Sequence, residues 1–185
     1  RVLSLDGDLE VRPGEVWTDG DRIAHVGPAP AQLPQFEREI DLKGDLVMPG
    51  FKNAHTHSAM TFLRSYADDL PLQAWLFDKV FPLEARLTPE AVYAFTRVAI
   101  LEYLSSGVTA SFDMYYHRDA YCQANIECGF RTVLCGALTA GDDPAIAERD
   151  YENYNRLHPL IRYQLGAHAE YTADETLLQG LAELV

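Results

Sequence analysis

Hydrophobic and polar positions in the first 50 residues alternate over short distances, in the way that is typical of β-strands. Segments 1–6, 15–20 and 22–27 carry this pattern. Residues 38–51 return to strand character after a loop that contains Pro and Ala. Turn signals punctuate the region at Asp6-Gly7, Pro13-Gly14, Asp19-Gly20 and Gly27-Pro28. The N-terminal part is therefore predicted to form the strands of a small β-module.

From about Leu46 the pattern changes to strands that alternate with helices. The clearest helix covers residues 88–107, where Thr88 suits the N-cap, Pro89 the first helical position and Gly107 the point past the end. Four strands are predicted at 46–57, 108–116, 130–139 and 161–172, and three further helices at 119–129, 144–158 and 172–185, the last capped near Thr172. Such a series predicts parallel strands joined by right-handed crossovers, with ligands bound at the C-terminal ends of the strands.

Polar residues stand at those strand ends: His55 and His57, Asp113, and His168 with Glu170. Side chains alternate along a strand, so His55 and His57 point to the same side and can share one metal ion. A bare pair of this spacing is more often the polar face of a surface strand, but its place at the end of a βα strand favours a metal site. Asp113 suits either an orienting partner of that site or a capping role in a loop.

Composition narrows the class of protein. The chain has 185 residues, 48% of them hydrophobic, and a net charge of −13, which argues against a general affinity for nucleic acid. Its three cysteines, Cys122, Cys128 and Cys135, match no zinc or CxxC spacing and are predicted to be free thiols in a reducing cytoplasm. No apolar run reaches the ~18–20 residues of a membrane helix, and no signal-peptide pattern opens the chain, so we expect a cytoplasmic protein with no membrane partner.

The segment LVMPGFKNAHTHSAMTFLRSYADDLPLQAWLFDKVFPLEARLTPE, from Leu46 to Glu90, resembles the amidohydrolase superfamily. Within it, the branch of 5-methylthioadenosine/S-adenosylhomocysteine deaminases and related chlorohydrolase-type enzymes is the most similar. The resemblance implies an α/β fold, the N-terminal half of a (β/α)8 TIM-type barrel preceded by strands of a small β-sandwich domain. Residues 1–48 would belong to the sandwich and residues 49–185 to the first four βα units of the barrel. It also implies one divalent metal ion, zinc or iron.

The resemblance further implies roles for individual residues. His55 and His57 match the first two metal ligands. Four residues match substrate contacts: Trp75 in the pocket wall, Glu84 at the ribose hydroxyls, His168 at the purine ring and Arg149 at the far end of the substrate. Without the resemblance, Trp75 fits a core aromatic equally well and His168 a structural histidine equally well, whereas Glu84 and Arg149 fit ordinary solvated charges better than substrate contacts. A second arginine expected after the third strand is absent, with Gly136 in its place. A substrate with an uncharged tail therefore fits the sequence at least as well as one whose tail carries a carboxylate.

The function expected from this set is hydrolytic deamination of an adenosine-like nucleoside, a small-molecule substrate, with release of ammonia. Two alternatives remain open: a guanine deaminase or triazine-type hydrolase of the same superfamily, and a non-catalytic half-barrel module. The resemblance places the proton-shuttling glutamate and the remaining metal ligands on later barrel strands, so no catalytic residue is predicted within these 185 residues. We expect the chain to be part of a longer enzyme, inactive alone and compatible with a homo-oligomer.

Overall fold

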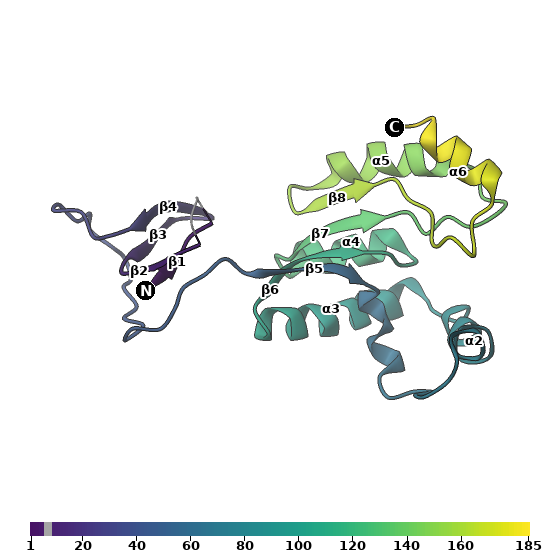
Figure 1. Ribbon diagram of the computed structural model, residues 1–185, viewed down its shortest axis with the longest axis horizontal. Coiled ribbons are helices and arrows are strands. Elements are labelled where there is room, and N and C mark those ends of the chain that lie inside the picture. Colours follow the sequence, from purple (N-terminus) through teal and green to yellow (C-terminus); the bar gives the residue numbers. More distant parts are fainter. Residues whose placement is uncertain (6–8) are drawn as a thin grey trace. The chain divides into compact units, whose positions relative to one another are not determined.

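The chain divides into two compact units, Arg1–Gly50 and Phe51–Val185, in the computed structural model, which describes residues 1–5 and 9–185. Figure 1 shows both units, with the smaller one made of strands and the larger one of strands and helices. The assignment of residues 1–48 and 49–185 to two separate domains stays a prediction.

The first unit contains two antiparallel pairs of strands. Strand β1 (Val2–Leu3) pairs with β2 (Val11–Arg12), and β3 (Glu15–Asp19) pairs with β4 (Arg22–Gly27). The pattern did not indicate β2, whereas the other three strands were expected. Gly20 has a φ of +56° in the turn between β3 and β4, a conformation that glycine adopts without strain.

The expected strand at 38–51 is largely wrong. Lys43 and Gly44 have φ values of 49° and 89°, so the backbone turns there and cannot stay extended. Within residues 38–50, only Val47 is bridged, to Val2, and Phe51 is the first residue of the next strand. The predicted Asp6-Gly7 turn lies outside the described residues.

The second unit contains a parallel sheet in the order β5 (Phe51–Thr56), β6 (Val108–Asp113), β7 (Arg131–Cys135) and β8 (Ile161–Gln164). Helices α3 (Pro89–Ser105), α4 (Arg118–Glu127) and α5 (Ala145–Leu157) connect these strands, and α6 (Glu175–Ala182) follows β8 (Figure 1). Spatial order equals chain order, as expected for successive βα units. The predicted α/β class and the first part of a TIM-type barrel are confirmed.

Local signals predicted the longest helix well and the last one less well. The Thr88 hydroxyl accepts a hydrogen bond from the Ala91 amide at 3.3 Å, and Gly107 has a φ of +81° past the end of α3. The cap of α6, predicted near Thr172, lies two residues further on. Asp174 caps this helix by accepting from the Leu177 amide at 2.8 Å, because the Thr172 hydroxyl is used within the preceding loop, where it donates to the Ala169 carbonyl.

A helical excursion separates β5 from α3. It consists of η1 (Ser58–Leu63), the short α1 (Leu72–Ala74), η2 (Trp75–Val80) and α2 (Phe81–Glu84). The η2 segment is a π-helix, in which the amide of Phe81 donates to the carbonyl of Leu76, five residues earlier. Glu84 is the last residue of α2.

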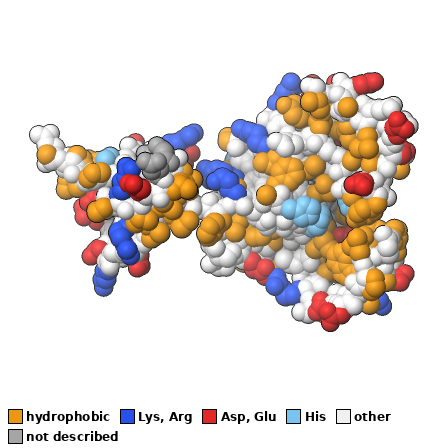
Figure 2. Space-filling model, viewed as in Figure 1, with side chains coloured by type: hydrophobic (Ala, Val, Ile, Leu, Met, Phe, Trp, Pro, Cys, Tyr) orange, Lys and Arg blue, Asp and Glu red, His pale blue; other side chains and the backbone are white. Residues whose placement is uncertain are grey.

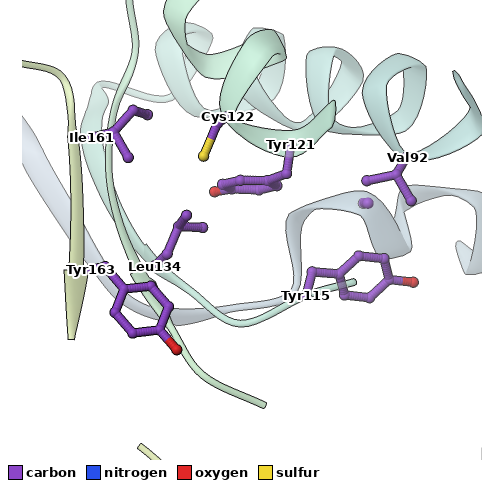
Figure 3. Packing of buried hydrophobic residues seen from close by; sticks show 8 residues of the cluster. Val92, Tyr115, Tyr121, Cys122, Leu134, Ile161 and Tyr163 are labelled. Atoms are coloured by element: carbon purple, nitrogen blue, oxygen red, sulfur yellow. The ribbon is translucent and has the colours of Figure 1, made fainter. Parts of the chain in front are cut away.

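The core of the larger unit lies between the sheet and its helices. Figure 3 shows Tyr121 and Cys122 of α4 packed with Leu134 of β7 and with Ile161 and Tyr163 of β8, all of which are almost fully buried. Burying large apolar side chains on both the helix and the strands ties the elements together and fixes the strand ends. The site described next depends on that rigidity.

Two of the three cysteines, Cys122 and Cys135, are buried in this unit, Cys128 is half-buried, and all three are free thiols. Burial raises the pKa of the Cys122 thiol to about 12. Among the described residues, no helix is both long enough and apolar enough to cross a membrane.

Candidate active site

His55 and His57 lie on the same face of β5, at its C-terminal end. Between them, the Thr56 hydroxyl lies 2.6 Å from the Tyr103 hydroxyl of α3, so Thr56 points toward the helices. The two histidines therefore point to the opposite face, and their ring centroids are 5.2 Å apart at 81°. This is the arrangement expected from strand alternation.

A backbone contact sets which nitrogen of His57 carries the proton. Its Nδ1 lies 2.8 Å from the carbonyl oxygen of Met114, just after β6. A carbonyl oxygen only accepts hydrogen bonds, so Nδ1 donates, and Nε2 of the neutral ring keeps a free lone pair. That is the state in which imidazole binds a metal ion.

His57 also lines a cavity of about 210 Å³ at the C-terminal ends of the strands. Glu84 and His168 are the other titratable side chains in its wall besides the tyrosines. In Figure 2, histidine side chains reach the surface of the larger unit beside hydrophobic ones. The remaining lining residues are mostly aromatic and aliphatic: Met60, Leu72, Trp75, Leu76, Val80, Phe81, Met114, Tyr115, Tyr116, Ala137 and Tyr171. Such a wall suits a flat, largely apolar ligand held by a few polar groups.

Glu84 presents its carboxylate to this cavity from the end of α2. Partial burial raises the pKa of Glu84, while the nearby Tyr115 hydroxyl and His57 lower it. The same environment acts on Tyr115, whose pKa is raised by burial and by the charge of Glu84. The two groups are therefore close, although their atoms do not form a hydrogen bond of normal geometry. Glu84 is a half-buried acceptor rather than an ordinary surface charge.

His168 is held in the loop after β8 by both its backbone and its ring. Its amide donates to the Leu138 carbonyl at 2.7 Å, and its Nδ1 lies 2.8 Å from the Thr172 hydroxyl. Thr172 donates its own proton to the Ala169 carbonyl at 3.1 Å, so it accepts from Nδ1 and leaves Nε2 of His168 free. Burial, and then the charge of His57, lower the pKa of His168, which favours the neutral ring.

The other predicted residues are placed less uniformly. Trp75 lies in η2 and lines the cavity, whereas Arg149 is exposed on α5 and does not line it. The structure thus brings His57, Trp75, Glu84 and His168 to one place but not Arg149, whose substrate contact stays a prediction. Glu170 is exposed outside the cavity wall.

Gly136 has no space for a side chain. A Cβ atom there would lie 2.7 Å from the Tyr163 hydroxyl oxygen and 2.9 Å from the Gly166 carbonyl oxygen. The packing of the loops that follow β7 and β8 therefore leaves no room for an arginine side chain at this position.

Three tyrosines of the wall were not singled out from the sequence: Tyr115, Tyr116 and Tyr171. A signal existed, because Tyr115 and Tyr116 lie two and three residues after β6 and Tyr171 lies in the loop after β8, where ligand-binding residues collect. The aromatic character of these positions would have strengthened the case for a planar ligand.

The donor set fits a divalent metal ion in part. Two imidazoles on one strand, one with a fixed tautomer, suit zinc, but a catalytic zinc site usually has three protein ligands. No group of three or more His, Cys, Asp or Glu side chains in the described part of the chain is arranged to hold an ion. His55 and His57 can therefore supply two ligands of a site, and a hydrogen bond to the Met114 carbonyl leaves Nε2 of His57 as the free ring nitrogen.

Comparisons with known proteins agree with this geometry. A 5-methylthioadenosine/S-adenosylhomocysteine deaminase of Caldicellulosiruptor saccharolyticus is 37% identical over 192 residues, which cover 99% of this chain and 44% of that protein. An adenosine deaminase from Xanthomonas campestris, solved with bound zinc, superposes with a TM-score of 0.74 at 28% identity, covering 94% of this chain and 42% of that one. A triazine hydrolase from Arthobacter aurescens gives a TM-score of 0.85 at 19% identity, covering 99% and 48%.

The chain spans about 44% of the length of this curated relative. The family model for amidohydrolases matches residues 46–185, which contain the whole parallel sheet, both histidines of β5 and the cavity. The sequence match and the strand-end site thus lead to the same result: the chain belongs to the amidohydrolase family.

Proposed function

We propose that this protein is a metal-dependent aminohydrolase that deaminates an adenosine-like nucleoside. The observation that carries the proposal is the convergence of His57, Glu84 and His168 on one aromatic cavity at the C-terminal ends of parallel strands. The names of the relatives support the reaction class, because those proteins are a nucleoside deaminase and an adenosine deaminase.

Each wall residue has a role in this proposal that its chemistry can perform. A carboxylate such as Glu84 accepts two hydrogen bonds, which suits the vicinal hydroxyls of a ribose. Trp75 and the tyrosines offer flat apolar surfaces for the base. His168, with Nε2 free, accepts a hydrogen bond from the amino N–H group of the base while its imidazole ring is neutral.

His55 and His57 would hold the metal ion, which is zinc in our proposal. Bound there, the ion would supply the Lewis acidity that activates water for attack on the carbon bearing the amine. The part played by this chain is to orient the nucleoside against that position and to exclude bulk water from the aromatic wall.

The test is ammonia release from adenosine, methylthioadenosine, S-adenosylhomocysteine and guanine, using the complete gene product. We expect the nucleosides to be deaminated and Glu84→Gln to lower their kcat/KM by about 10- to 100-fold, because a charge-assisted hydrogen bond contributes about 1.5–3 kcal/mol. Guanine, which has no ribose, should be unaffected by this substitution.

Glu102→Gln is the matched control, because Glu102 pairs with Arg64 on the exposed side of α3, away from the cavity. It should leave all kinetic constants unchanged. Faster turnover of guanine than of any nucleoside would favour the guanine deaminase alternative, and the absence of ammonia from all four compounds would contradict the proposal.

A further inference from the structure

Asp113 is a fully buried carboxylate at the end of β6, and it does not line the cavity. Its side chain lies between the sheet and helix α4, where it contacts Tyr121. Burying a charge costs several kcal/mol unless the charge is satisfied by hydrogen bonds. A carboxylate at this place therefore needs a specific set of donors.

The described donors come from two directions. The amide of Ser58 lies 3.3 Å and 3.2 Å from the two carboxylate oxygens, the Ser58 hydroxyl also donates to Asp113, and the Tyr121 hydroxyl donates at 2.7 Å. Ser58 is the residue immediately after His57. Asp113 thus accepts hydrogen bonds from both the backbone and the side chain of Ser58, which directly follows the predicted metal ligand His57.

Two more bonds join the same strand ends. The amide of Met114 donates to the Thr56 carbonyl at 3.3 Å, and Nδ1 of His57 donates to the Met114 carbonyl at 2.8 Å. Three consecutive residues, Thr56, His57 and Ser58, are therefore each bonded to Asp113 or Met114. The histidine is held through the residue before it, through its own ring and through the residue after it.

We propose that Asp113 is a positioning residue that sets the orientation of His57 toward the metal ion. This inference rests on the proposed function, because it takes His57 as a ligand. Asp113 acts through Ser58, whose fixed amide and hydroxyl prevent the chain after β5 from rotating and carrying the imidazole with it. Loss of such an outer partner typically weakens metal binding by about 10- to 100-fold.

The surrounding polar side chains provide a matched control. The Thr132 hydroxyl of β7 lies 2.9 Å from the Tyr121 hydroxyl and 3.1 Å from the Ser111 hydroxyl, and it is as deeply buried as Asp113. No described hydrogen bond joins Thr132 to β5 or to Ser58. Thr132→Val therefore disturbs the same buried layer and removes one partner of Tyr121, while the bonds from Ser58 to Asp113 and from His57 to Met114 stay in place.

The experiment measures zinc affinity by chelator competition in the complete gene product, for the wild type and for Asp113→Asn, Thr132→Val and His57→Ala. We expect Asp113→Asn to weaken zinc binding by about 10- to 100-fold, because an amide presents a donor to groups that are themselves donors. The visible spectrum of the cobalt-substituted protein should also change in Asp113→Asn, since it reports ligand geometry. Thr132→Val should leave both the affinity and the spectrum unchanged even if it lowers the unfolding midpoint.

If Asp113→Asn does not fold, Ser58→Ala replaces it, because this substitution removes the hydroxyl donor and keeps the backbone amide. It should weaken zinc binding less than Asp113→Asn, by about threefold to tenfold. Zinc affinity within about twofold of wild type in Asp113→Asn, or in Ser58→Ala where that variant stands in, overturns the inference if His57→Ala still loses zinc. Unchanged affinity in His57→Ala would instead overturn the proposed metal site itself.

Discussion

Gly136 offers a direct test of the loop packing that positions His168. Alanine at this position would place its Cβ atom 2.7 Å from the Tyr163 hydroxyl oxygen and 2.9 Å from the Gly166 carbonyl oxygen. Tyr163 is 1% exposed, and its ring stacks on Tyr154 with centroids 5.9 Å apart, so it has no free space into which to turn. The loop after β7 must therefore move.

The size of the effect follows from two opposing contributions. Forcing one extra methyl group into a packed interior costs about 1–3 kcal/mol. Replacing Gly by Ala also stabilises by about 0.4–1 kcal/mol, because it reduces the conformational freedom of the unfolded chain. We expect Gly136→Ala to lower the free energy of unfolding by about 1–2 kcal/mol.

Urea unfolding of the complete gene product, followed by circular dichroism, measures this change. Tyr163→Phe supplies the rescue, because the Tyr163 hydroxyl has no described hydrogen-bond partner and its removal takes away one of the two close contacts. The double variant should recover part of the loss. The same loop carries the Leu138 carbonyl, which accepts a hydrogen bond from the His168 amide. Because a shift of the loop would displace His168, the KM for the nucleoside substrate should rise in Gly136→Ala. A neutral or stabilising Gly136→Ala would refute the packing argument.

Three further outcomes are expected. Thr88→Ala should destabilise the protein by about 1 kcal/mol through loss of the α3 cap, whereas Ser105→Ala, at the exposed other end of that helix, should change the unfolding midpoint little. Burial raises the pKa of Cys122 to about 12, so this thiol should resist iodoacetamide at pH 8 in the folded protein and react once urea unfolds it. Peptide mass spectrometry reads the modification, and reaction of the folded protein as fast as a small free thiol in solution would contradict the burial. Because the pKa of folded His168 lies below its ordinary value of 6.5, the unfolded state takes up the proton first. The part of the stability due to this residue should therefore be lost as the pH falls below about 6.5, and His168→Asn should show a weaker loss over that range in urea midpoints.

Features that depend on neighbouring residues could be predicted from the sequence. Thr88 and Pro89 mark the start of α3 by local hydrogen bonding and a preset φ, and alternation along β5 puts His55 and His57 on one face. Both signals act within a few residues, so no tertiary information was needed. Thr172 shows the limit of such signals. Its hydroxyl donates to the Ala169 carbonyl and accepts from the His168 ring, so Asp174, two residues later, caps the helix instead.

The composition of the cavity could not be predicted in the same way. Trp75, Tyr115 and Tyr171 come from three separate connections, and nothing in the local pattern says that these connections meet. Asp113 was recognised at a strand end, but its partner Ser58 lies 55 residues earlier in the chain. Contacts of this range depend on strand order and loop packing, which the sequence pattern indicates only as a class of fold.

The π-helical segment η2 determines which side chains of this helical stretch face the cavity. Trp75 and Glu84 are nine positions apart, and at about 100° per residue an uninterrupted α-helix would turn them to opposite sides. Each i→i+5 turn accommodates an extra residue and so rotates less per residue, which brings the two side chains back toward one side, where both line the cavity. Removing one residue between Trp75 and Val80 would let the segment relax to α-helix, but it would also shift the register of everything before it. The wide turn thus changes the angle between these two side chains about the helix axis. Helix geometry rather than side-chain chemistry places an indole and a carboxylate at the same cavity.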